Sequence, residues 1–285
     1  METKINVVLV HGAWADGSSW RKVIPLLQDK GFNVTGVQLP LTSLTDDIAV
    51  TRNMLAAQKG PTVLVGHSYG GAVITGAGNG APNVTALVYI AAFGLDENES
   101  LEILSKQGPA PSGATQIRPD DHGFLWISPD GFPAAFAADV DPVEARVMAA
   151  VQKPLSIKSF AEKSGPPAWK HIKSWYLVSS NDQMIPPQAE EFMAKRMGAT
   201  VRSVPSSHAS MVSHPKEVAD ITLWRRNRPV LRRQKRNGTK NHFSRERRPM
   251  TAPGREPTVS EDLPFGSVPK RFREGKYGSR AQSND

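Results

Sequence analysis

The chain has 285 residues, which is enough for one domain of about 220 residues and an appendage. It contains no cysteine, and this excludes disulfide bonds, a thiolate nucleophile and any cysteine-ligated metal site. The net charge of +8 is unevenly distributed: residues 225–285 hold 17 basic and 6 acidic residues, whereas residues 1–224 hold 18 basic and 21 acidic residues. The basic character belongs to the C-terminal segment and carries no information about what the mildly acidic body binds.

Strands and helices are predicted to alternate along the body. Apolar, β-branched runs predict strands at residues 5–10, 34–38, 62–65, 86–92, 174–179 and 200–204. Helices are predicted at residues 18–30 (capped by Ser18 or Ser19), 45–58 (capped by Thr45), 71–77, 187–197 and 215–221. This alternation predicts an α/β fold, a mostly parallel sheet of about six strands with helices on both faces.

The strand rhythm stops between residues 95 and 167, a segment rich in Pro, Ala and Gly. Helix signals occur at residues 133–138 and 141–152, where Asp141 is a suitable N-cap and Pro142 suits the first helical position. We expect this insert to form a small helical lid whose aromatic side chains help to line an apolar pocket. Residues 1–94 and 168–224 then form the core.

Residues 225–285 show almost no apolar periodicity and contain much Arg, Pro, Gly and Ser. Such a segment buries too little apolar surface to offset the entropy of ordering it, so we expect a basic, disordered tail. An out-of-frame extension would explain its abrupt start at Arg225. The alternative explanation is a tail that binds nucleic acid or anionic surfaces, but the segment contains no recognisable nucleic-acid-binding fold.

The N-terminal apolar run at residues 7–10 is too short for a signal sequence or a membrane span. We therefore expect a cytoplasmic protein that does not associate with membranes.

The pentapeptide Gly66-His67-Ser68-Tyr69-Gly70 lies between a predicted strand and a predicted helix. A serine at the apex of such a sharp turn adopts strained backbone geometry and presents its hydroxyl above the sheet edge. An ordinary glycine-rich turn or a phosphate-binding loop is the alternative, but the glycine spacing of a phosphate loop is absent. We interpret Ser68 as a nucleophile.

A serine hydroxyl needs a general base, and the base needs a carboxylate that orients it. On this architecture the chain order is serine, acid, histidine. Asp182 follows the strand ending at Ser179 and is the preferred acid, with Asp96 as the runner-up. His208 follows the last strand and is the preferred base; His214 is the competitor, which we expect at the start of the last helix.

Negative charge that develops on a carbonyl oxygen must be met by backbone N–H groups already in place. One donor is expected from Tyr69, the residue after the nucleophile. The other is expected from Ala13, in the loop that follows the first strand, where Gly12 allows a tight turn.

Together, His11-Gly12-Ala13-Trp14, the pentapeptide around Ser68, Asp182 and His208 resemble the α/β-hydrolase superfamily. The body is similar to the compact branch that contains plant methylesterases, hydroxynitrile lyases and bacterial esterases, over about residues 4–223. The resemblance implies a Ser-His-Asp enzyme without cofactor or metal, usually a carboxylic ester hydrolase, and a small hydrophobic ester as substrate. The oligomeric state stays open.

Three other functions fit the same scaffold. A cofactor-free lyase and a carbon–carbon bond hydrolase are two, although lyases of this branch typically place a lysine directly after the histidine, where this chain has Ala209. The third is a non-catalytic protein that binds a small ligand.

Deletion of residues 225–285 is expected to leave turnover of a small soluble ester nearly unchanged, because the predicted site lies wholly within the body. Steady-state kinetics of the truncated and full chains test this expectation. A large loss of turnover on deletion would mean that the tail packs on the body.

Overall fold

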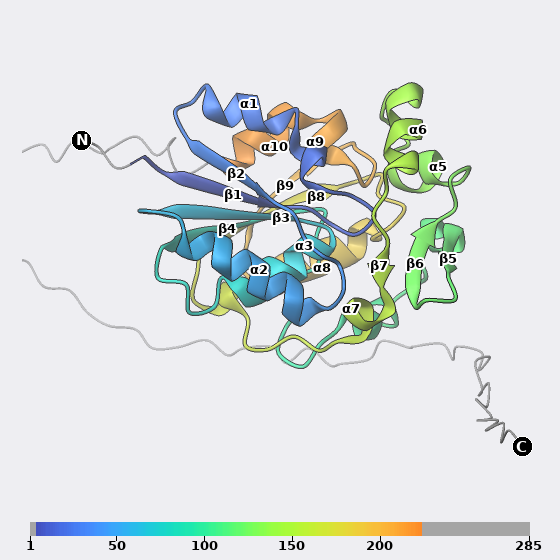
Figure 1. The fold of residues 1–285 in the computed structure, drawn as a ribbon, viewed down its shortest axis with the longest axis horizontal. Helices are drawn as coiled ribbons and strands as arrows, with labels where there is room; N and C mark the ends of the chain where they lie inside the picture. Colours follow the sequence, from blue (N-terminus) through green and yellow to red (C-terminus); the bar gives the residue numbers. More distant parts are fainter. Residues whose placement is uncertain (1–3, 224–285) are drawn as a thin grey trace, which may run out of the picture. The chain divides into compact units, whose positions relative to one another are not determined.

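The computed structural model describes residues 4–223, and its centre is a single sheet of six parallel strands (Figure 1). The strand order is β2-β1-β3-β4-β8-β9, and each neighbouring pair is parallel. The strands are β1 (Asn6–Val10), β2 (Asn33–Val37), β3 (Thr62–His67), β4 (Val84–Ile90), β8 (Ser174–Ser179) and β9 (Thr200–Val204). The predicted α/β fold is confirmed, with each strand within two residues of its expected start.

Helices cover both faces of this sheet, which is why its central strands consist of apolar residues without alternation. All residues of β1, β3 and β8 are buried. In Figure 1, α1 and α10 lie on one face, and α2, α3 and α8 lie on the other. These helices are α1 (Val23–Gln28), α2 (Leu44–Ala56), α3 (Tyr69–Ala77), α8 (Pro187–Arg196) and α10 (Pro215–Thr222).

Two predicted helix starts were wrong. The cap of α2 is Ser43, whose hydroxyl accepts a hydrogen bond from the Asp46 N–H, and Thr45 instead lies inside the first turn. The single helix expected from residue 18 is a short 3₁₀ turn, η1 (Gly17–Trp20), followed by α1. Asp16 caps that turn by accepting from the Ser18 N–H, because an Asp side chain serves this role as well as a serine does.

The insert at residues 95–167 lies at one end of the sheet (green to yellow in Figure 1). Its helices are α4 (Leu101–Ser105), α5 (Phe132–Phe136), α6 (Pro142–Ala150) and α7 (Ile157–Ala161), and Asp141 caps α6 as expected. The prediction of a helical insert was incomplete. Three short strands, β5 (Ile117–Pro119), β6 (Phe124–Ile127) and β7 (Leu155–Ser156), form an antiparallel sheet within it.

The described residues belong to one compact unit. The expectation of a disordered tail at residues 225–285 falls outside them. Among residues 4–223, no helix combines the length and the apolar character that crossing a membrane requires.

The closest backbone approach that positions the site occurs between β3 and α3. A Cβ atom added at Gly66 would lie 2.5 Å from the Gly70 carbonyl oxygen and 2.9 Å from the Gly71 nitrogen. Backbone atoms cannot yield to such a contact as a flexible side chain can, so only glycine allows the chain to reverse here.

Gly66→Ala is therefore expected to lower the free energy of unfolding by about 1–3 kcal/mol, or to prevent folding. Gly36→Ala in the neighbouring β2 is the matched control, because its nearest neighbour would lie at an ordinary 3.8 Å. Urea titrations of the two variants measure the difference. Equal stabilities would contradict the steric argument.

Candidate active site

Ser68 occupies the turn between β3 and α3 with a backbone conformation of φ 53° and ψ −124°. A non-glycine residue with positive φ is strained and persists only where the surrounding structure imposes it. The turn is held by contacts of the Ser68 backbone: its N–H donates to the Ile90 carbonyl, and its carbonyl accepts from the Gly71 and Phe93 N–H groups. Hydrogen bonds to β4, to the loop that follows it and to α3 therefore hold Ser68 in its strained conformation.

The loop after β1 lies directly against this serine. A Cβ atom added at Gly12 would be 2.7 Å from the Cβ of Ser68 and 3.0 Å from the His67 carbonyl oxygen. The neighbouring Ala13 is 2% exposed, so the loop is also buried at this position. Tyr69 is the first residue of α3, and its N–H has no acceptor within the helix.

His11 fixes the conformation of that loop. Its Nε2 accepts from the Leu39 N–H at 2.9 Å, and its Nδ1 donates to the Gly12 carbonyl at 2.8 Å. The two bonds require the neutral imidazole with its proton on Nδ1. Burial lowers the pKa of His11 to about 4, which keeps this form at neutral pH.

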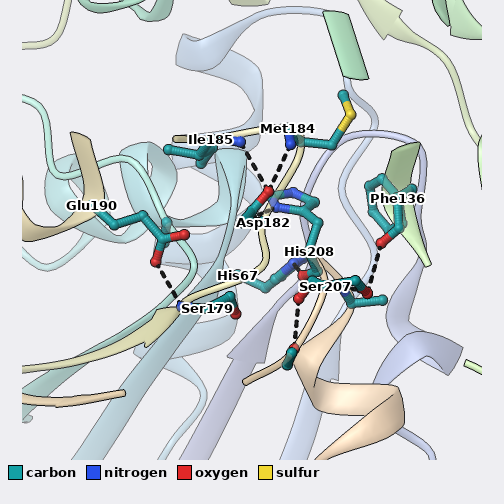
Figure 2. Close-up of polar contacts among 12 residues, drawn as sticks. His67, Phe136, Ser179, Asp182, Met184, Ile185, Glu190, Ser207 and His208 are labelled. Carbon is teal, nitrogen blue, oxygen red and sulfur yellow. Dashed lines mark hydrogen bonds and ion pairs between the residues drawn. The ribbon is translucent and has the colours of Figure 1, made fainter. Parts of the chain in front are cut away.

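Asp182 and His208 lie together, although 26 residues separate them. His208 Nδ1 donates to Asp182 Oδ2 at 2.6 Å, and both side chains are buried (Figure 2). The other oxygen, Oδ1, accepts from the N–H groups of Met184 at 2.7 Å and Ile185 at 2.9 Å. Three donors thus orient the carboxylate, which in turn orients the imidazole.

The second nitrogen of His208, Nε2, is buried and has no hydrogen-bond partner among the described residues. Nδ1 carries the proton that it donates in the hydrogen bond to Asp182. Nε2 of the neutral ring therefore presents a lone pair. A base with an available lone pair and an oriented ring is what activation of a hydroxyl requires.

The residue before Ser68 links the turn to His208. His67 Nε2 donates to the His208 carbonyl at 2.8 Å, and the two rings lie 4.7 Å apart between centroids. Burial and the neighbouring His208 hold the pKa of His67 well below its usual value, so His67 stays neutral. The nucleophile candidate and the base candidate therefore belong to one cluster.

The two alternatives from the sequence lie elsewhere. Asp96 forms an ion pair with Lys170 at 2.6 Å. His214 precedes α10, as expected, and its Nε2 lies 3.4 Å from Asp139 Oδ2. Among residues 4–223, no hydrogen bond or ion pair joins Asp96 or His214 to Asp182 or His208.

The insert touches both loops of the site. The Trp14 N–H donates to the Lys153 carbonyl at 3.0 Å, and the Trp14 indole N–H donates to the Leu125 carbonyl at 2.8 Å. On the other side, the rings of Phe136 and His208 form a T-shaped pair with 4.8 Å between centroids. With these contacts made, Ser68 is 3% exposed and His208 is 0% exposed.

The Ser207 hydroxyl adds a third link between the insert and the site. It donates to Asp139 Oδ1 at 2.5 Å, and its oxygen lies 3.3 Å from the Phe136 carbonyl oxygen. The loop that carries His208 is thus tied to the insert one residue before the imidazole.

The profile of the Alpha/beta hydrolase family matches residues 7–221, which is most of the chain. The chain belongs to this family. The resemblance seen in the sequence is confirmed, and the family match spans every residue discussed for the site. Within residues 4–223, no three His, Cys, Asp or Glu side chains gather so that they could hold a metal ion.

Individual relatives are more distant. A carbendazim hydrolyzing esterase of a Nocardioides species is 35% identical over 125 residues, which cover 39% of this chain and about half (52%) of that protein. A polyneuridine aldehyde esterase of Rauvolfia serpentina is 26% identical over 248 residues, 76% of this chain and 94% of the relative. A pyrethroid hydrolase of Sphingobium wenxiniae is 24% identical over 259 residues, 76% and 86% of the two chains.

Solved structures share the fold. The pyrethroid hydrolase of Sphingobium faniae superimposes with a TM-score of 0.67 at 22% identity, covering 76% of this chain and 95% of that chain. Polyneuridine aldehyde esterase superimposes with a TM-score of 0.68 at 20% identity, covering 79% of this chain and all of the other.

Sequence reasoning missed the contact that holds the Tyr69 side chain. The Tyr69 hydroxyl donates to Asp47 Oδ2 at 2.5 Å, and Asp47 Oδ1 accepts from the Leu41 N–H at 2.8 Å. Burial raises the pKa of Asp47 to about 6, although both hydrogen bonds oppose that rise. Asp47 lies in the first turn of α2, and a local sequence pattern does not show which side chains of a helix are buried.

Tyr69→Phe would leave Asp47 Oδ2 buried without its donor. We expect a loss of about 1–3 kcal/mol in the free energy of unfolding. The matched control is Tyr89→Phe, which removes a hydroxyl paired with the neutral Thr75 hydroxyl at 2.9 Å and should cost about 0.5–1.5 kcal/mol. Chemical denaturation near pH 8 compares them. A smaller loss for Tyr69→Phe than for the control would refute a charge-assisted bond.

Proposed function

We propose that this protein is a serine hydrolase that cleaves carboxylic esters through an acyl-enzyme intermediate. The observation that carries the proposal is the Asp182–His208 hydrogen bond of 2.6 Å, with His208 Nε2 unpaired in the cluster that contains the strained Ser68 turn. Membership of the Alpha/beta hydrolase family supports a hydrolytic reaction. The relatives named esterases support an ester as the bond that is broken.

In this mechanism, His208 Nε2 removes the Ser68 proton as the hydroxyl attacks the ester carbonyl. Asp182 holds the imidazole in the correct tautomer and stabilises the imidazolium that forms. The carbonyl oxygen becomes negative and accepts hydrogen bonds from the Ala13 and Tyr69 N–H groups. His208 then gives the proton to the departing alcohol.

Water completes the cycle by the same steps. His208 takes a proton from the water as it attacks the acyl carbonyl, and Ser68 leaves with that proton. Because Ser68 and His208 are almost fully buried and Phe136 of the insert packs on His208, substrate entry requires the insert to move.

The apolar side chains at the site favour a small hydrophobic ester. Phe136 forms a T-shaped pair with the imidazole and stacks on Phe132 at 4.9 Å between ring centroids. Trp14, next to Ala13, is 8% exposed and donates its indole N–H to the Leu125 carbonyl of the insert. An apolar acyl or alcohol group would be desolvated by these rings.

Ser68→Ala is expected to lower kcat for an aryl ester by roughly 10⁶, because it removes the hydroxyl that forms the acyl-enzyme. His208→Ala should produce a comparable loss. His214→Ala is the matched control and should retain activity, since His214 pairs with Asp139 and not with Asp182. Steady-state assays with esters graded by acyl length provide the measurement.

Covalent labelling gives an independent check. A fluorophosphonate should modify Ser68 in the full chain but not in His208→Ala, and peptide mass spectrometry identifies the modified residue. Retention of more than a tenth of the activity in Ser68→Ala, or labelling at another serine, would overturn the proposal. An unlabelled Ser68 together with tight binding of intact ester would indicate a binding protein.

A further inference from the structure

A second carboxyl group lies behind Asp182. Glu190 extends from α8, is 0% exposed, and reaches toward Asp182 (Figure 2). Its Oε2 accepts from the Ser179 N–H at 3.2 Å, at the end of β8. Its Oε1 is buried and, with both carboxyl groups ionised, has no hydrogen-bond donor. A buried carboxylate oxygen without a donor is rare enough to need an explanation.

The groups around Glu190 do not favour a negative charge. Asp182 is the strongest electrostatic neighbour, Glu191 lies next along α8, and Tyr176 faces Glu190 from β8. Each of these groups is an acid. The nearby His208 offers no proton to Glu190, because its Nδ1 proton is already donated to Asp182 in a hydrogen bond. Burial, followed by the charge of Asp182, raises the pKa of Glu190 well above its usual value.

We propose that Glu190 is a positioning residue of the active site: as a neutral carboxylic acid it donates its Oε1 proton to the Asp182 carboxylate. This inference rests on the proposed function, because it assigns Glu190 to the support of the Asp182–His208 pair. A proton on Glu190 turns the buried Oε1, which has no donor of its own, into a donor to Asp182.

The arrangement gives Asp182 four donors, namely the N–H groups of Met184 and Ile185, His208 Nδ1 and the Glu190 acid. A carboxylate has about four lone-pair sites, so these donors satisfy it completely. Asp182 is thereby held in place from the side opposite His208. It also keeps a single negative charge for the imidazolium that forms during turnover.

Glutamine at this position would preserve both bonds, because its amide nitrogen can donate to Asp182 while its oxygen accepts from the Ser179 N–H. Leucine has a similar shape but makes neither bond. Glu190→Gln and Glu190→Leu therefore separate the hydrogen bond from the packing. Glu191→Gln is the matched control on the same helix, since Glu191 is exposed.

The first measurement is stability against pH, which does not depend on activity. A carboxyl group with a raised pKa binds a proton in the folded chain that the unfolded chain has released. Above the usual pKa of glutamate, the folding equilibrium constant of the wild type should fall about tenfold per pH unit relative to Glu190→Gln, until Glu190 ionises. Glu191→Gln should run parallel to the wild type.

The second measurement is catalytic. Glu190→Gln should keep kcat within about threefold at neutral pH and lose less activity than the wild type at alkaline pH, where ionised Glu190 would repel Asp182. Glu190→Leu should lower kcat about tenfold or more with little change in KM, since a hydrogen bond to a charged group is removed. The downfield NMR signal of the His208 Nδ1 proton should persist in Glu190→Gln and shift in Glu190→Leu.

A wild-type stability curve parallel to that of Glu190→Gln would show that Glu190 is ionised, and equal kcat and NMR signals in Glu190→Gln and Glu190→Leu would show that it does not position Asp182. Either result overturns this inference and leaves the proposed function intact. Failure of the proposed function would appear separately, as activity that survives in Ser68→Ala.

Discussion

The 2.6 Å bond between Asp182 and His208 joins two loops that leave neighbouring parallel strands, β8 and β9. Each loop has little regular structure of its own, so the pair depends on what surrounds it. Met184 and Ile185 N–H groups hold the carboxylate, His67 holds the backbone of His208, and Phe136 packs on the ring. The bond is short because both partners are buried and pre-oriented, and in such surroundings a charge-assisted hydrogen bond is strong.

The sheet provides the second constraint. Parallel strands end at a common edge, and there the turn at Ser68 and the Gly12 loop come into backbone contact. Glycine at positions 12 and 66 is a steric requirement of that contact, since a Cβ atom at either position would overlap backbone or Ser68. The elements around Ser68 are each stabilised by their own packing, and together they hold the serine in its strained conformation.

The insert is bonded to the same loops that carry the candidate catalytic groups. Trp14 and Ser207 lie one residue away from Ala13 and His208, and both donate hydrogen bonds into the insert. A movement of the insert would therefore also act on the loop of Ala13 and on the loop of His208. The contacts between the insert and these two loops both cover the site and hold its loops in place.

The sequence by itself determined the six strands, the turn at Ser68, and the preference for Asp182 and His208 over Asp96 and His214. These features rest on local patterns: β-branched runs, glycine spacing, and the rule that polar groups after parallel strands meet at one edge. Only the tertiary structure decided the antiparallel sheet in the insert, the Ser43 cap, the Asp47–Tyr69 bond and the burial of Glu190 beside Asp182. An acidic residue in a helix reads as solvent-exposed from its neighbours in the chain, and its burial depends on side chains that folding brings from distant positions.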